Sequence, residues 1–339
     1  MTTTVSPRST AHSAWAFWLV EPGRGELRAQ TLPEPGAGEV RVRALYSGIS
    51  RGTESMVFRG EVPVSEYARM RAPFQDGEFP GPLKYGYASV GRVEAGEPAL
   101  IGRRVFCLFP HQDQYVVPVS AVRPIPDQVP AERAVLAANM ETAINGLWDG
   151  APLLGERIVV VGAGVVGLLV AALATRIPGC EVELVDIDEN RRPIAQAFGA
   201  TLATPACARG GADRVFHCSG SAAGLQTALT LAGLEATVIE MSWFGAKQVP
   251  LALGEAFHSQ RLTLRSSQVG RLPSAQISRW NTRRRLDLAL AQLADPRFDL
   301  LISGETRFAA LPGRMAELAA PGGRALCERV AYPLASSTS

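Results

Sequence analysis

The stretch that decides the fold is Arg157-Ile158-Val159-Val160-Val161-Gly162-Ala163-Gly164-Val165-Val166-Gly167-Leu168-Leu169-Val170. β-forming residues run into G-x-G-x-x-G, and an apolar segment follows, so the stretch predicts a strand, a tight turn and a helix over residues 165–176. Gly162 permits the turn, Gly164 leaves room for a phosphate, and Gly167 lets the helix pack closely on the strand. The helix N-terminus offers unpaired N–H groups. This pattern is typical of a dinucleotide-binding unit.

A second apolar strand, residues 182–185, follows the helix and ends in Asp186. This acid lies about 20 residues beyond the glycines, where a carboxylate can bind the ribose hydroxyls of an adenosine. Because Asp186 would repel a 2′-phosphate, the sequence favours NAD over NADP. Arg191 and Arg192 lie just beyond and could hold that phosphate, so NADP stays the less favoured alternative.

Length and composition limit the classes of protein to which the chain can belong. Its 339 residues suffice for two domains, and a net charge of +2 favours neither a nucleic acid nor an anionic membrane as partner. The apolar run at residues 14–20 is too short to span a bilayer or to serve as a secretory signal, so we expect a cytoplasmic protein without a membrane partner. The five cysteines are scattered and form no C-x-x-C pair, which argues against disulfides and a cysteine-rich zinc site.

The order of predicted elements indicates a β domain and an α/β domain. Turn signals separate short strands between residues 14 and 125, and residues 131–148 have a helical pattern. Strands and helices then alternate, which predicts a doubly wound parallel sheet. A helix at residues 283–293, short elements and a closing strand at residues 324–330 complete the chain.

Several segments, spread over nearly the whole chain, resemble the medium-chain dehydrogenase/reductase superfamily. They are Leu32–Val42, Gly48-Ile49-Ser50, Val90–Val93, Thr142-Ala143 and the glycine motif itself. The runs Ser47–Ser55 and Lys84–Tyr87 are most similar to its zinc-type alcohol dehydrogenase-like and bacteriochlorophyllide a dehydrogenase-like branch. The resemblance implies a GroES-like β-barrel catalytic domain (residues 1–139 and 271–339), a Rossmann domain (residues 140–270) and an active site between them.

The chain departs from this family where its zinc-dependent members bind catalytic zinc. Ser50 stands in place of a cysteine, and Gly86-Tyr87-Ala88 in place of Gly-His-Glu. The third ligand would fall near Ala137 or Ala138, which cannot bind a metal. Catalytic zinc needs three protein ligands and an open position. The sequence therefore predicts an enzyme without zinc.

Without a metal, a hydrogen-bond donor must polarise or protonate the reacting oxygen. Tyr87 stands in the position of the metal-binding histidine and should face the cleft, where its phenol could donate a hydrogen bond or, with a lowered pKa, accept a proton. Tyr87 could instead merely fill the vacated site. Ser50 could relay a proton or be a small polar filler. Glu54 could orient a substrate hydroxyl, cap a helix or form an ion pair.

Two further side chains are candidates for acid–base chemistry. Glu141 is an acid at a position expected to be buried, so an ion pair and a base role are both open. His111 lies on a loop expected near the cleft, and histidine has a suitable pKa for proton transfer, but a surface histidine without function is the alternative.

The expected cofactor contacts combine the glycine turn, the acid after the second strand, the threonine that the resemblance places against the nicotinamide, and a later loop. They are Gly162, Gly164, Val165, Val166, Gly167, Asp186, Arg191, Thr142 and Ser219.

We expect a metal-independent oxidoreductase that transfers a hydride between NAD(H) and a secondary alcohol or ketone of a polar, biosynthetic small molecule. The alternatives are an NADPH-dependent enoyl or quinone reductase and a non-catalytic paralogue. The resemblance also implies a homodimer joined near Leu262–Ser267.

Overall fold

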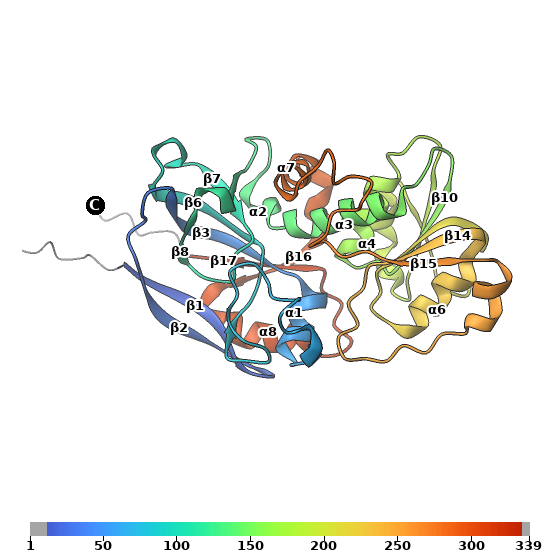
Figure 1. Cartoon of the computed structure of the whole chain (residues 1–339), viewed down its shortest axis with the longest axis horizontal. Coiled ribbons are helices and arrows are strands. Elements are labelled where there is room, and N and C mark those ends of the chain that lie inside the picture. The colour runs from blue at the N-terminus through green and yellow to red at the C-terminus, as the bar shows by residue number, and fades with distance from the viewer. Residues whose placement is uncertain (1–11, 334–339) are drawn as a thin grey trace, which may run out of the picture.

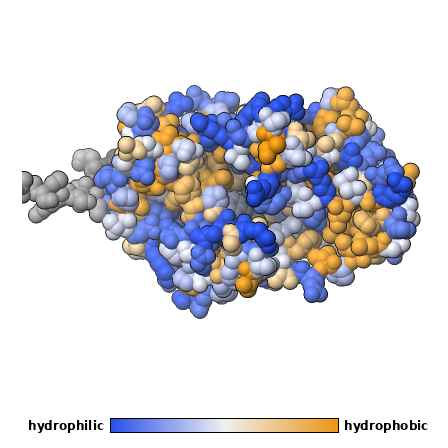
Figure 2. Space-filling view, viewed as in Figure 1, coloured by the Kyte–Doolittle hydropathy of each residue, from blue (hydrophilic) through white to orange (hydrophobic). Residues whose placement is uncertain are grey.

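The computed structural model describes residues 12–333, which form a β domain and a parallel-sheet domain with a hollow between them (Figures 1 and 2). The C-terminal segment returns to the β domain, because its last strand pairs with β3 near the start of the chain. The two domains confirm the predicted fold class. No helix within the described residues has the length and apolar character that crossing a bilayer requires.

The Rossmann sheet has six parallel strands in the order β12-β11-β10-β13-β14-β15. They span Arg157–Val161 (β10), Glu181–Val185 (β11), Thr201–Ala203 (β12), Ala212–His217 (β13), Ala232–Glu240 (β14) and Thr263–Ser266 (β15). After β10, the chain first adds β11 and β12 on one side of it and then β13, β14 and β15 on the other. The strand order therefore reverses between β10 and β13, and this is the point at which ligands bind in such sheets.

Helices cover both faces of this sheet, and the alternation of side chains in β10 shows why. Ile158 and Val160 pack with the core on the side of α3 and α4, whereas Val159 and Val161 pack with the core on the side of α6. The helices are α3 (Ala137–Gly150), α4 (Val165–Ala174), α5 (Arg192–Ala197), α6 (Ala222–Leu231) and α7 (Thr282–Gln292). Strand β10 is apolar throughout its interior because both of its faces are buried.

The β domain has a four-stranded sheet, β2-β1-β5-β4, and a larger sheet, β16-β17-β3-β6-β7-β9, with β8 paired to β3. The strands are β1 (His12–Glu21), β2 (Arg24–Leu32), β3 (Glu39–Ile49), β4 (Asp76–Gly77), β5 (Leu83–Lys84), β6 (Ser89–Gly96), β7 (Arg104–Cys107), β8 (Gln114–Pro118), β9 (Val122–Pro124), β16 (Ile302–Arg307) and β17 (Cys327–Ala331). Its helices are α1 (Arg51–Phe58), α2 (Ala131–Ala134) and α8 (Leu311–Ala319).

The turn between β10 and α4 brings backbone atoms unusually close together. A Cβ added to Gly167 would lie 1.9 Å from the carbonyl oxygen of Gly162. Gly162 has a φ of +104°, and a Cβ there would lie 2.7 Å from the backbone nitrogen of Ser219. A Cβ on Gly164 would meet no atom within 4 Å, so the protein leaves this position open. The roles predicted for the three glycines therefore agree with the geometry.

This geometry predicts different effects for the same substitution at two of the glycines. Gly167→Ala forces α4 away from β10 and should lower the free energy of unfolding by roughly 1–3 kcal/mol, as overpacking does. Gly164→Ala is the matched control and should stay within about 1 kcal/mol of the wild type, since Gly164 is the open helix N-cap. Urea titration followed by circular dichroism measures both. Equal stability of the two variants would contradict the close approach.

Candidate functional site

A cleft of about 890 Å³ lies between the two domains. Its walls come from the glycine turn, the loops that follow β11, β13 and β14, the start of α1, and the C-terminal return. The lining includes Ser50, Arg51, Thr53, Asn139, Gly162, Gly164, Val165, Val166, Asp186, Arg191, Ser219, Ser242, Trp243 and Arg324. Seven of the nine residues predicted to contact the cofactor therefore line one continuous cleft, whereas Gly167 and Thr142 do not line it.

The carboxylate of Asp186 is held at the edge of this cleft by two backbone N–H groups. Ala163 N donates to Oδ2 at 2.6 Å and Asp188 N donates to Oδ1 at 2.8 Å. The next side chain, Ile187, is apolar and 88% exposed, which is unusual for an isoleucine unless a ligand covers it. An apolar surface, a fixed carboxylate and an open glycine backbone fit the adenosine and phosphate parts of a dinucleotide.

Arginines from three parts of the chain converge on the same cleft. Arg191 donates to the carbonyl of Arg324 and lies 3.5 Å from Asp188. Arg51, at the start of α1, donates to the carbonyl of Gly323. Burial and then the charges of Arg191 and Arg59 lower the pKa of Arg51. This concentration of positive charge suits an anionic ligand group.

The sequence prediction did not assign a role to Arg51 or Arg324. Arg51 could have been found, because it directly follows Ser50 in a motif already recognised. Arg324 follows a glycine pair near the end of the chain, and its place in the cleft depends on the pairing of β17 with β3. No local pattern in the sequence reveals that pairing.

The positions at which the resemblance implies zinc ligands hold hydroxyl and methyl groups here. Ser50 lines the cleft at the N-cap of α1, while Ala137 and Ala138 are buried. Tyr87 is half-buried and packs against both neighbouring cores, beside the cleft rather than in its wall. Within residues 12–333, no three His, Cys, Asp or Glu side chains converge so that they could hold a metal ion.

The phenol of Tyr87 is set up to donate a hydrogen bond. Burial first, and then the charge of Glu54, raise its pKa to about 12, and the hydroxyls of Ser50 and Thr53 oppose this rise. At neutral pH the phenol therefore keeps its proton. The raised pKa favours the role of hydrogen-bond donor over the alternative in which a lowered pKa lets Tyr87 accept a proton.

Glu54 and His111 form a buried pair behind Ser50. His111 Nε2 lies 2.8 Å from Glu54 Oε2, and the two side chains are 1% and 2% exposed. Glu54 Oε1 accepts the backbone N–H of Ser50 at 2.8 Å, and His111 Nδ1 lies 2.7 Å from Ser47 Oγ. The structure thus corrects the alternative of a surface histidine. Glu54 both caps the start of α1 and pairs with His111 through a hydrogen bond. Neither side chain lines the cleft.

Glu141 pairs with a cation and does not face the cleft. Arg285 Nε donates to its Oε1 at 3.0 Å, and both side chains are buried. Burial raises the pKa of Glu141, and Arg285 partly offsets the rise. The hydroxyl of Thr142 donates to the carbonyl of Ala138 within the same helix. On this helix it is Asn139, which the sequence prediction missed, that reaches the cleft.

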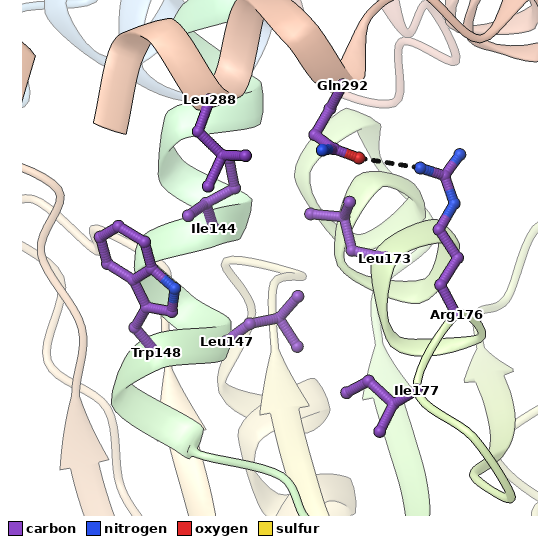
Figure 3. Close-up of a pocket in the computed structure, with 8 residues that line it drawn as sticks. All are labelled: Ile144, Leu147, Trp148, Leu173, Arg176, Ile177, Leu288 and Gln292. Carbon is purple, nitrogen blue, oxygen red and sulfur yellow. Dashed lines mark hydrogen bonds between the residues drawn. The ribbon is translucent and has the colours of Figure 1, made fainter. Parts of the chain in front are cut away.

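A second, smaller pocket of about 260 Å³ lies outside the cleft, between α3, α4 and α7 (Figure 3). Its wall is largely apolar, with Ile144 and Leu147 on α3 facing Leu173 on α4. A hydrogen bond of 2.9 Å between Arg176 and Gln292 crosses one end. It contains none of the residues that the sequence predicts for the site.

Comparison with known proteins gives relatives in sequence for part of the chain. No protein-family model matches the chain. D-xylulose reductase of Saccharomyces cerevisiae is 29% identical over 133 residues, which cover 34% of this chain and 37% of the yeast protein. The matched segment is thus little more than a third of the length of that relative.

Solved structures match over nearly the whole chain. A Sinorhizobium meliloti protein described as a zinc-binding dehydrogenase and bound to NADP gives a TM-score of 0.75 at 20% identity, covering 94% of this chain and 99% of the other. An alcohol dehydrogenase of Escherichia coli complexed with NADH gives 0.72 at 18% identity with the same coverage. At these identities the likeness establishes the fold. The chain therefore has the fold of these dehydrogenases, as the resemblance implies, and about a third of it is similar in sequence to D-xylulose reductase.

Proposed function

We propose that the chain is a metal-independent dehydrogenase that transfers a hydride between a nicotinamide cofactor and a secondary alcohol or ketone. One observation carries the proposal: a single cleft joins a dinucleotide-binding glycine turn to the hydroxyl of Ser50, which stands where the resemblance implies a zinc ligand. The cofactor, when bound, supplies or accepts the hydride. The residues opposite must bind and orient the substrate and manage one proton.

The contacts of Asp186 and Arg191 favour NAD over NADP. The Asp186 carboxylate is fixed at the cleft edge, where it would accept hydrogen bonds from ribose hydroxyls and repel a 2′-phosphate. Arg191 is turned toward Asp188 and the carbonyl of Arg324, so its guanidinium is already engaged. Arg51 and Arg324 line the same cleft and offer further positive charge for the pyrophosphate.

Neutral donors would take over the role of the metal. Ser50 lines the cleft, and Tyr87 lies beside it with its proton retained. Both can donate hydrogen bonds to an oxygen on which negative charge develops, as donors in an oxyanion hole do. Glu54 and His111 are positioning residues, since Glu54 holds the backbone of Ser50 and neither reaches the cleft.

The cleft suits a polar substrate more than a plain alkyl alcohol. Thr53, Arg59, Glu61 and Lys247 contribute polar groups to the part of its wall nearest α1, while Trp243 contributes an aromatic face. Such a wall can bind an oxygen-rich small molecule of a biosynthetic pathway.

The first prediction concerns the reaction itself. Purified protein treated with EDTA should oxidise NADH or reduce NAD with a panel of polar ketones or secondary alcohols, and more efficiently than with NADP(H). Absorbance at the nicotinamide band and metal analysis measure this. Stoichiometric zinc with loss of activity in EDTA would overturn the metal-free mechanism. Turnover of enones or quinones with NADPH, but not of ketones, would support the reductase alternative instead.

The second prediction concerns Tyr87. Tyr87→Phe removes one donor and should lower kcat by about 10²-fold, the effect of losing one oxyanion-hole donor, without changing the Kd for NADH. Tyr85→Phe is the matched control, because Tyr85 contacts Tyr87 edge-on with ring centroids 6.0 Å apart and is also buried. Full activity of Tyr87→Phe would show that the ring only fills space.

The third prediction concerns assembly. Strand β15 is exposed along its length at the edge of the Rossmann sheet, and apolar side chains gather at this end of the molecule (Figure 2). Such an edge can pair with a second copy. We therefore expect a homodimer by light scattering, and Leu264→Lys should shift it to monomer. A monomeric wild-type protein would exclude the dimer.

A further inference from the structure

A buried histidine connects the two loops that follow β13 and β14. His217, at the end of β13, has a fully buried side chain. Its Nδ1 lies 2.7 Å from Glu240 Oε2 at the end of β14, and its Nε2 lies 2.6 Å from Ser219 Oγ. Ser219 Oγ lies 3.1 Å from Ser221 Oγ. The same glutamate accepts the backbone N–H of Ser242 on Oε1 at 2.6 Å.

The donors and acceptors that each side chain offers fix the direction of the hydrogen bonds in this network. An ionised Glu240 can only accept, so Nδ1 of a neutral His217 carries the proton and Nε2 accepts from the hydroxyl of Ser219. Ser219 Oγ in turn accepts the backbone N–H of Ser221 at 3.3 Å. Ser221 Oγ accepts from Gly224 N at 3.0 Å, which leaves its proton for Ser219.

The order serine–histidine–glutamate is also that of a catalytic triad, but Ser219 is poorly placed as a nucleophile. Its hydroxyl proton and lone pairs are used within the chain of hydrogen bonds described above. The oxygen of Ser219 also packs against the first turn of α6, where a Cβ added to Gly224 would lie 2.1 Å from it. The network therefore holds a loop in place and does not attack a substrate.

Ser242 differs from Ser219 because its hydroxyl proton remains available. Its Oγ accepts the backbone N–H of Gly220 at 3.0 Å. The nearest nitrogen, His217 Nδ1 at 3.5 Å, already donates to Glu240 and cannot accept. No other acceptor contacts this hydroxyl in residues 12–333, and Ser242 lines the cleft. Its proton is therefore free for a ligand oxygen.

The sheet order indicates which part of the ligand would meet Ser242. Asp186 ends β11, on one side of β10, and would hold the adenosine half of the cofactor. Ser219 and Ser242 follow β13 and β14, on the other side of the crevice. A dinucleotide straddles this crevice, so its nicotinamide half lies over β13 and β14.

We propose that the hydroxyl of Ser242 donates a hydrogen bond to the nicotinamide half of the cofactor, and that His217 and Glu240 are positioning residues that hold Ser242 and the turn at residues 219–221. The proposal rests on the proposed function, since it requires a nicotinamide cofactor in the cleft. It adds to that function a specific donor for the reactive half of the cofactor.

Binding measurements test the proposal without a substrate. NADH is titrated by its fluorescence and ADP by calorimetry, since ADP lacks the nicotinamide half. Ser242→Ala should raise the Kd for NADH about five- to tenfold, the effect of one lost hydrogen bond, and leave the Kd for ADP unchanged. Ser242→Thr keeps the hydroxyl and should bind NADH as the wild type does.

A matched control and a positioning variant complete the test. Thr227 lines the same cleft, but its hydroxyl donates to the carbonyl of Ala223 at 2.9 Å, so Thr227→Val should change neither Kd. His217→Gln should weaken the binding of NADH more than that of ADP. It should also abolish the downfield proton NMR signal expected for an imidazole N–H that donates to a carboxylate.

The outcomes separate this proposal from the proposed function. Equal NADH affinity of Ser242→Ala and the wild type would overturn the role of Ser242. A parallel loss of ADP and NADH binding would do so as well, because it would indicate a general disturbance of the cleft. A wild-type protein that binds ADP but neither NADH nor NADPH would overturn the proposed function itself.

Discussion

The close approach of α4 to β10 is the constraint on which the cleft depends. With 1.9 Å between the carbonyl oxygen of Gly162 and a Cβ built on Gly167, any side chain at Gly167 would push α4 off the sheet. Gly162 also meets the backbone of Ser219, so the loop after β13 is seated on the same turn. The helix N-terminus, the carboxylate of Asp186 and the later loops are placed relative to one another by this single contact region. A ligand that enters the cleft meets a preformed surface.

Some of this arrangement could be predicted from the sequence because it is encoded locally. The glycine turn, the buried strand β10 and the acid after β11 each follow from residues close together in the chain. Strands β2 and β16 were missed because both are largely polar and half-exposed, so they lack the alternation of apolar residues that identifies a strand. Helix α8 was missed as well.

The two buried pairs that glutamates form with a histidine and an arginine could not be predicted, because the partners are distant in the sequence. Glu54 and His111 are separated by 57 residues and Glu141 and Arg285 by 144. Each residue alone suggested several roles, from surface group to general base. Only the packing of α1 against the β domain and of α7 against α3 decides between them. The same holds for Asn139, whose place in the cleft depends on how α3 crosses between the domains.

The two walls of the cleft share one electrostatic arrangement. On the β-domain side, the backbone N–H of Ser50 donates to Glu54, which pairs with His111, which contacts Ser47. On the Rossmann side, the backbone N–H of Ser242 donates to Glu240. Glu240 pairs with His217, and His217 contacts Ser219.

A carboxylate withdrawn from water is costly unless it is paired and hydrogen-bonded, and both the buried Glu54 and the partly buried Glu240 meet this requirement. Each pair can therefore fix a serine at the cleft wall while keeping its own charge away from the ligand. A site built in this way presents oriented neutral donors to both reacting partners. The proposed hydride transfer without a metal would use such donors.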